Sequence, residues 1–127
     1  MTIERKDDHG TEFGLWLRNQ PELDSSLGFT ATNLDYIWTA PNENYMLIEE
    51  KRYGKEVKIW QHNVFLKIDN NCKNDTFYQG FHELIFENTN PENGWIKFDG
   101  KIITKKELIE ILKLGFIPYD QEFLEQI

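Results

Sequence analysis

The chain is poor in cysteine and in long apolar runs. Its 127 residues include one cysteine, Cys72, which excludes an internal disulfide and a zinc site built from several thiolates. A lone thiol is typical of proteins in a reducing cytoplasm. No apolar run approaches the ~20 residues of a membrane-spanning helix, and residues 1–8 are too charged for a secretory signal peptide. We therefore expect a cytoplasmic protein with no membrane partner.

Positive charge is scarce as well. Fourteen Lys and Arg residues face 22 Asp and Glu residues, so the net charge is −8, which disfavours simple tight binding to duplex nucleic acid. The charge is uneven, however, because the segment 51–67 has one acid, Glu56, and five basic residues: Lys51, Arg52, Lys55, Lys58 and Lys67. This segment is either a surface for phosphate groups or the solvated face of a helix.

Hydrophobic residues make up 39% of the chain, which excludes general disorder. The length favours one domain over 1–127, and the polar ends, 1–9 and 118–127, are expected to be loose. Four tryptophans are spread over different predicted elements, which favours core packing over a stacking platform for unpaired bases: Trp16, Trp38, Trp60 and Trp95.

Apolar periodicity and turn residues predict seven elements. Helices are predicted over 11–19, over 57–68 and from Thr104 to just before Gly115, and strands over 33–38, 45–51, 81–86 and 95–98. A hairpin turn is predicted at 39–44, a loop at 70–75, a turn at Asp99-Gly100, and a capping box between Thr104 and Glu107. The order α-β-β-α-β-β-α implies an α/β fold with a mixed central sheet flanked by helices.

Charged residues stand out in the first two predicted strands. Asp35 lies in the strand before the predicted hairpin turn, and Glu49-Glu50-Lys51 ends the strand after it. Because strand side chains alternate, Glu49 and Lys51 share one face and Glu50 points to the other. The hairpin can therefore bring Asp35, Glu49 and Lys51 together, and two carboxylates at one point suit a divalent metal ion.

This arrangement resembles the PD-(D/E)xK nuclease superfamily, whose mark is an Asp on one strand and a (D/E)-x-K tripeptide on the next. Residues 28–37 look like the Asp strand of small phage and bacterial members, and 46–51 look like their metal strand. The following helix, with Gln61, looks like the helix on which many members carry a Gln. The resemblance covers residues 10–115 approximately and implies a restriction-endonuclease-like core.

The resemblance also implies roles for single residues. Asp35 and Glu49 would hold Mg²⁺, for which Mn²⁺ would substitute, with the peptide carbonyl of Glu50 as a further ligand. Lys51 would orient or activate the attacking water, and Gln61 would support these groups. Glu12, on the first helix, either extends the metal shell or only suits the helix dipole. Three basic residues would contact the nucleic-acid backbone: Arg52, Lys55 and Lys58.

Gln61 and its neighbour His62 differ in their predicted surroundings. Gln61 falls near the middle of an apolar stripe, where its amide needs hydrogen-bond partners, so it either points at the carboxylates or is bonded to backbone. His62 is expected to face away from the centre of that stripe, on the surface.

Three hypotheses follow for the function. The leading one is a Mg²⁺-dependent nuclease acting on DNA. Because so small a domain has little surface for reading sequence, selectivity for branched or single-stranded DNA, or action as a homodimer, is favoured. The second is a non-enzymatic acidic protein on the same fold that occupies the nucleic-acid groove of another enzyme, which the net charge would suit. The third is a structural subunit in which Glu49 and Lys51 form a plain surface pair.

Overall fold

The computed structural model describes residues 11–29 and 31–117. The ends that the sequence predicts to be loose, 1–9 and 118–127, lie outside the described residues. The chain forms two compact units, residues 1–33 and 34–127. The expectation of a single domain stays a prediction, and each unit is described by itself below.

The described part of the first unit, residues 11–29 and 31–33, contains one short α-helix and two 3₁₀-helices. Helix α1 spans Glu12–Arg18, as the sequence predicts, and the Oγ1 atom of its N-cap residue, Thr11, accepts a hydrogen bond of 2.9 Å from Gly14 N. The 3₁₀-helices, Pro21–Leu23 and Ser25–Leu27, were not predicted. Pro21 begins the first of them, where its fixed φ and missing N–H carry no cost.

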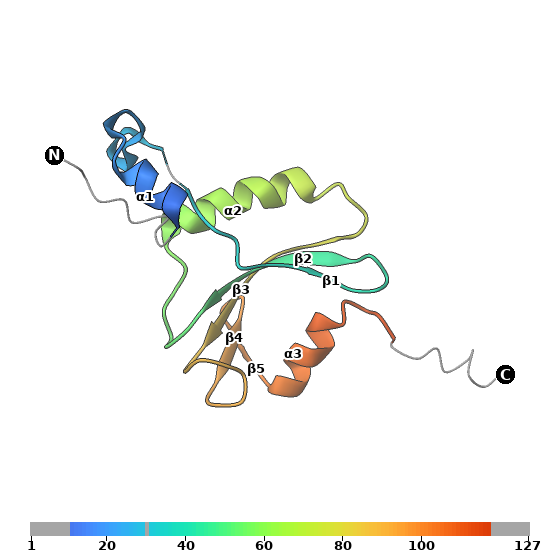
Figure 1. Cartoon of the computed structure of the whole chain (residues 1–127). Coiled ribbons are helices and arrows are strands. Elements are labelled where there is room, and N and C mark those ends of the chain that lie inside the picture. The colour runs from blue at the N-terminus through green and yellow to red at the C-terminus, as the bar shows by residue number, and fades with distance from the viewer. Residues whose placement is uncertain (1–10, 30, 118–127) are drawn as a thin grey trace, which may run out of the picture. The chain divides into compact units, whose positions relative to one another are not determined.

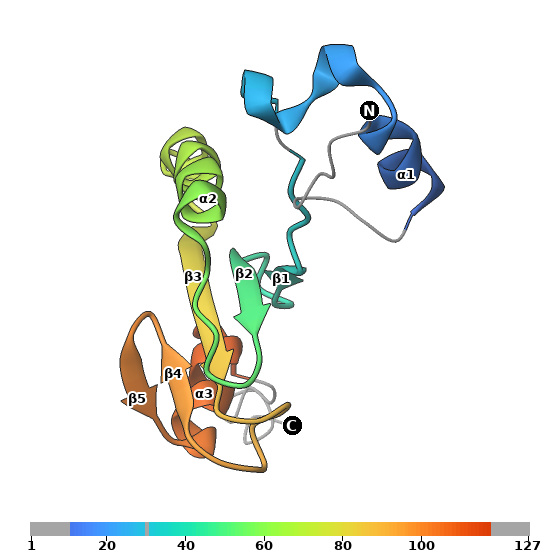
Figure 2. The ribbon, with the colours of Figure 1, turned by 90° about the vertical axis from the view of Figure 1, so that its left-hand side faces the viewer.

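Over its described residues, 34–117, the second unit is a mixed five-stranded sheet with two helices, which confirms the α/β class. The sheet has the order β1-β2-β3-β4-β5, which Figure 2 shows from right to left, and only β2 and β3 are parallel. The elements are β1 Tyr36–Thr39, β2 Tyr45–Lys51, α2 Ile59–Cys72, β3 Tyr78–Phe86, β4 Ile96–Phe98, β5 Lys101–Ile103 and α3 Lys105–Leu112. No helix within the described ranges is long and apolar enough to cross a membrane.

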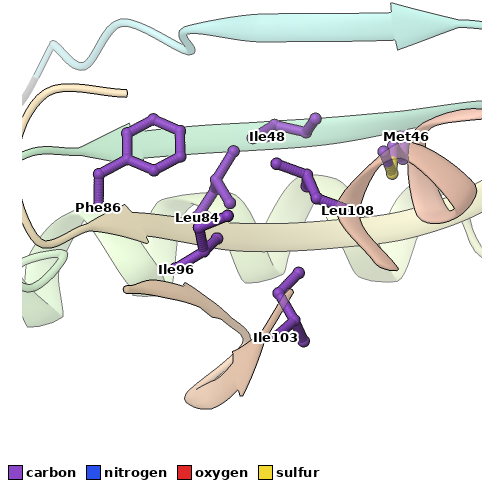
Figure 3. Packing of buried hydrophobic residues seen from close by; sticks show 7 residues of the cluster. All are labelled: Met46, Ile48, Leu84, Phe86, Ile96, Ile103 and Leu108. Atoms are coloured by element: carbon purple, nitrogen blue, oxygen red, sulfur yellow. The ribbon is translucent and has the colours of Figure 1, made fainter. Parts of the chain in front are cut away.

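The two helices of this unit lie on opposite faces of the sheet (Figure 1). Helix α2 connects β2 to β3 and packs on one face, where Phe65 stacks on Phe81 with ring centroids 4.7 Å apart. Helix α3 packs on the other face, where Leu108 joins the main core. Figure 3 shows that core between the sheet and α3, and its seven buried residues are Met46, Ile48, Leu84, Phe86, Ile96, Ile103 and Leu108.

Several local predictions are confirmed. The hairpin joins β1 to β2 through the predicted turn, where Ala40 N donates to Asn44 O over 2.8 Å. Thr104 and Glu107 form both hydrogen bonds of the capping box at the start of α3. Asp99 and Gly100 turn the chain from β4 to β5, and Gly115 has a φ of 80° after α3 ends.

Other element boundaries differ from the predictions. Strand β1 begins at Tyr36 and not at residue 33, so Asp35 lies just before the strand. The backbone pairing ends there because the N–H of Glu50 donates its hydrogen bond to the Asp35 side chain and not to a backbone carbonyl. Helix α2 begins at Ile59 because Lys58 is extended, and it continues to Cys72 through part of the predicted loop at 70–75. Its last turns are tied to β3 by Asp69 Oδ1, which accepts hydrogen bonds from the Tyr78 hydroxyl and from Phe81 N.

Strands β3 and β5 also depart from expectation. Strand β3 begins at Tyr78, before the predicted Phe81, because a bulge at Gly80, whose φ is 100°, lets the pairing with β2 continue. Strand β5 was not predicted, since three residues are too few for an apolar alternation to stand out. The prediction that the tryptophans pack in the core is wrong for Trp16 and Trp38, which are 52% and 39% exposed.

Candidate active site

The sheet register brings the two predicted carboxylates together. Tyr36 of β1 lies opposite Ile48 of β2, and this register continued by one residue places Asp35 opposite Glu49. Asp35 Oδ2 accepts a hydrogen bond of 2.8 Å from Glu50 N, which anchors it at the end of β2. Asp35 itself is exposed, so its carboxylate is accessible from solvent.

Glu49 is buried, with 3% of its surface exposed. The pKa of Glu49 is raised to about 8, chiefly by burial and also by a hydrogen bond with the Asp35 carboxyl group and by the negative charge of Asp35, while the Lys51 ammonium lowers it. Glu49 Oε2 is enclosed and accepts no hydrogen bond from any donor within the described residues. A buried oxygen in this state costs free energy unless a proton or a cation binds there.

Lys51 and Glu50 lie on opposite faces of β2, as the alternation predicts. Lys51 Nζ is 4.0 Å from Glu49 Oε1, and a quarter of its side chain is exposed. The Glu50 side chain accepts hydrogen bonds from the Tyr36 hydroxyl, at 3.2 Å, and from Arg52 Nε, at 3.0 Å. Glu50 can therefore join a metal shell only through its backbone carbonyl. Because Glu49 is buried, the hypothesis of a plain surface pair between Glu49 and Lys51 is wrong.

An open cleft of about 520 Å³ lies at this end of β2. Asp35 and Lys51 line it, but Glu49 does not. Arg52 and Lys55, two of the basic residues predicted to contact a nucleic-acid backbone, also line it, whereas Lys58 does not. Its complete lining is Asp35, Tyr36, Glu50, Lys51, Arg52, Tyr53 and Lys55, in which three cations face two carboxylates although the chain as a whole is acidic.

Helix α2 presents Gln61 and His62 at half-buried positions. The Oε1 atom of Gln61 is fully enclosed, which agrees with the predicted core-facing position. His62 is at the surface as expected, with 44% of its side chain exposed, but its Nδ1 atom also lies 2.6 Å from Glu83 Oε1 on β3, a contact that was not predicted. The sheet register pairs Glu83 with Glu49, so His62 and Glu83 flank the candidate site.

Glu83 and His62 were missed by the sequence analysis. Glu83 lies in a predicted strand whose pairing was not predicted, and only the parallel pairing of β2 with β3 places it beside Glu49. They line a second pocket, of about 290 Å³, with Lys97, whose ammonium lies 5.3 Å above the Trp95 ring. The signal that could have identified Glu83 in the sequence is that it is a single acidic residue on a predicted apolar strand.

Glu12 lies in the first turn of α1, in the unit of residues 1–33, and is exposed. Its proposed contribution to a metal shell stays a prediction.

Asp35 and Glu49 fit a divalent cation by the chemistry of their donors. Mg²⁺ is usually bound through one or two carboxylates and keeps several waters, so two carboxylates on neighbouring strands are enough. The enclosed Glu49 Oε2 is an oxygen that a cation would satisfy. Within the described residues no group of three or more His, Cys, Asp or Glu side chains is placed to hold a metal ion, so water and substrate oxygens would complete the shell.

No family model, curated protein or solved structure matches this chain. The interpretation of the site therefore rests on its own geometry.

Proposed function

We propose that the chain is a metal-dependent nuclease of the PD-(D/E)xK type, with a restriction-endonuclease-like core, that hydrolyses DNA phosphodiester bonds. The observation that carries the proposal is the burial of Glu49 opposite Asp35, with Lys51 beside them at the mouth of a cleft. A protein with no use for a cation would gain stability from an apolar side chain at position 49.

Each residue of the site has a task in this proposal. Asp35 and Glu49 supply carboxylate oxygens to Mg²⁺ or Mn²⁺, with the Glu50 carbonyl as a further donor. The metal, when bound, polarises the scissile phosphate and lowers the pKa of a water molecule. Lys51 holds the attacking water in place and stabilises the negative charge that develops on the phosphoryl oxygens.

Arg52 and Lys55 contact the neighbouring phosphates from the cleft, and Lys58, outside it, is assigned to the more distant backbone. Gln61 supports the carboxylates from α2. Selectivity for branched or single-stranded DNA, or action as a homodimer, remains part of the proposal because the cleft alone offers little surface for reading sequence.

The test is Mg²⁺- and Mn²⁺-dependent cleavage of supercoiled, linear, nicked, branched and single-stranded DNA and of RNA. We expect cleavage by the parent protein and a loss of about 100-fold or more in Asp35→Ala and Lys51→Ala, since each removes an interaction with the transition state. Lys101→Ala, at an exposed position of β5, is the matched control and should cleave normally. Calorimetry that detects no metal binding, with no substrate cut, would refute the nuclease.

The net charge of −8 favours a second candidate, an acidic protein on this fold that occupies the nucleic-acid groove of another enzyme. Metal binding separates the two, because an active nuclease needs the cation and an acidic inhibitor does not. An inhibitor would keep its activity in Asp35→Ala and Lys51→Ala.

A further inference from the structure

Tyr53 lies in a turn that is unusual for an aromatic residue. Tyr53 has a φ of 57° and Gly54 a φ of 68°, and Lys55 N donates to Arg52 O over 3.2 Å. These are the positive φ values of a type I′ turn, whose first central position favours Asn, Asp or Gly. A tyrosine there is strained, and strain of this kind collects where a side chain has a task.

The turn is held in place from the neighbouring strand. Tyr53 N donates to Asn88 O and Gly54 N donates to Phe86 O, both over 2.9 Å. A Cβ atom at position 54 would lie 3.6 Å from the Trp95 ring, so Gly54 packs closely against that side chain. The backbone of Tyr53 is therefore fixed even though its side chain is not buried.

Tyr53 is 65% exposed and lines the same cleft as Lys51. Arg52 and Lys55, which lie before and after Tyr53 in the sequence, line this cleft as well. Apolar burial does not explain this position, because two thirds of the residue remains in solvent. An exposed aromatic ring between two cations is the combination that binds single-stranded nucleic acid, in which bases stack on rings and phosphates meet the cations.

We infer that Tyr53 is a base-stacking residue and that the cleft takes DNA with an unpaired nucleotide beside the scissile phosphate. The inference deepens the proposed function and rests on it for the identity of the cleft. In duplex DNA each base is stacked between its neighbours, so its face is not available to the ring. Tyr53 therefore favours single strands, flaps and junction arms over continuous duplex.

The test is fluorescence anisotropy of the full-length protein with a labelled single-stranded DNA oligonucleotide, its duplex and its RNA counterpart, without divalent metal so that no strand is cut. We expect Tyr53→Phe, which keeps the ring, to bind single-stranded DNA as the parent does. Tyr53→Leu should bind it about 5- to 150-fold more weakly, the range for loss of one base–aromatic stack, with little change for duplex.

Two further variants keep the result interpretable. Phe77→Leu removes an exposed ring at the opposite end of β2, where Phe77 O accepts a hydrogen bond from Tyr45 N, and should bind normally. Tyr53→Asn removes the ring but suits the left-handed backbone, so it replaces Tyr53→Leu if that variant does not fold.

Equal binding by Tyr53→Leu and the parent overturns the inference, as does an equal loss for duplex and single strand. Tighter, Tyr53-dependent binding of RNA overturns the assignment to DNA. These outcomes are distinct from failure of the proposed function. Cleavage that requires Lys51 but is unchanged in the Tyr53 variants would contradict the stacking role and still support the nuclease. Tyr53-dependent binding of single-stranded DNA without metal-dependent cleavage would support the binding cleft and refute the nuclease activity.

Discussion

The two faces of the sheet in residues 34–127 are built from the same strands but differ in chemistry. The main core lies between one face and α3 and consists of six strand residues and Leu108 of α3. The face under α2 also buries apolar residues, Leu47, Phe65 and Ile85, but Glu49 lies among them and His62 is paired with Glu83 at its margin. One face supplies stability, which allows the other to hold a carboxylate where burial is unfavourable.

Alternation along β2 produces this division. Met46 and Ile48 point toward α3, whereas Leu47 and Glu49 point toward α2. Substitutions of core residues on the first face should therefore change stability without touching the site, and substitutions of Glu49 or Lys51 on the second should change the site.

The largest expected effect is on the α3 face. Leu84→Ala should lower the free energy of unfolding by about 2–5 kcal/mol, because it leaves a cavity in the main core. Urea denaturation followed by circular dichroism measures this change. Ile102→Ala, at an exposed position of β5, is the control and should change stability by less than about 0.5 kcal/mol. Equal effects of the two variants would contradict the assignment of the core.

Glu49→Gln tests the opposite face. Because the pKa of Glu49 is raised to about 8 in the folded protein, the folded state holds a proton that the unfolded state has released between about pH 5 and 8. The free energy of unfolding of the metal-free parent should therefore fall as pH rises through this window, by an amount on the order of 1–3 kcal/mol. In Glu49→Gln, which cannot release this proton, the free energy of unfolding should not show this fall with pH.

The measurement is urea denaturation in EDTA at several pH values. Glu110→Gln, at an exposed position paired with Lys113, is the matched control and should keep the slope of the parent. A slope that survives in Glu49→Gln would show that another group titrates in this window.

Metal binding should depend on the same proton. Below about pH 8 a cation must displace the proton of Glu49, so the affinity for Mg²⁺ or Mn²⁺ should rise by up to about tenfold per pH unit. Isothermal titration calorimetry in buffers of different ionisation enthalpy measures both the affinity and the proton released. An affinity that does not change with pH would remove Glu49 from the metal shell.

The smallest effects concern the cations of the cleft. Arg52→Ala and Lys55→Ala should each weaken DNA binding and lower the slope of log affinity against log salt concentration by about 1, because each removes one phosphate contact. The effect of Arg52→Ala should be the smaller, since Glu50 already pairs with its guanidinium over 3.0 Å. The control Lys101→Ala should leave this slope unchanged. A slope that Arg52→Ala and Lys55→Ala also leave unchanged would exclude this cleft from phosphate binding.

Much of the fold could be predicted because its signals are local. The hairpin turn, the capping box of Thr104 and the alternation around Glu49 each depend on a few adjacent residues. The boundaries of α2 and the existence of β5 could not, because they depend on what these segments contact. Asp69, for example, extends α2 by accepting hydrogen bonds from β3, which no pattern within the helix indicates.

The sequence by itself determined which residues of β2 share a face, and hence that Glu49 and Lys51 point away from Glu50. That follows from the two-residue repeat of any strand. Tertiary structure alone decided how deeply Glu49 is buried, which residues flank it, and that Tyr53 is exposed in the cleft. The reason is that the burial of Glu49 and the parallel pairing of β2 with β3 both require the crossover connection between these strands, which contains α2.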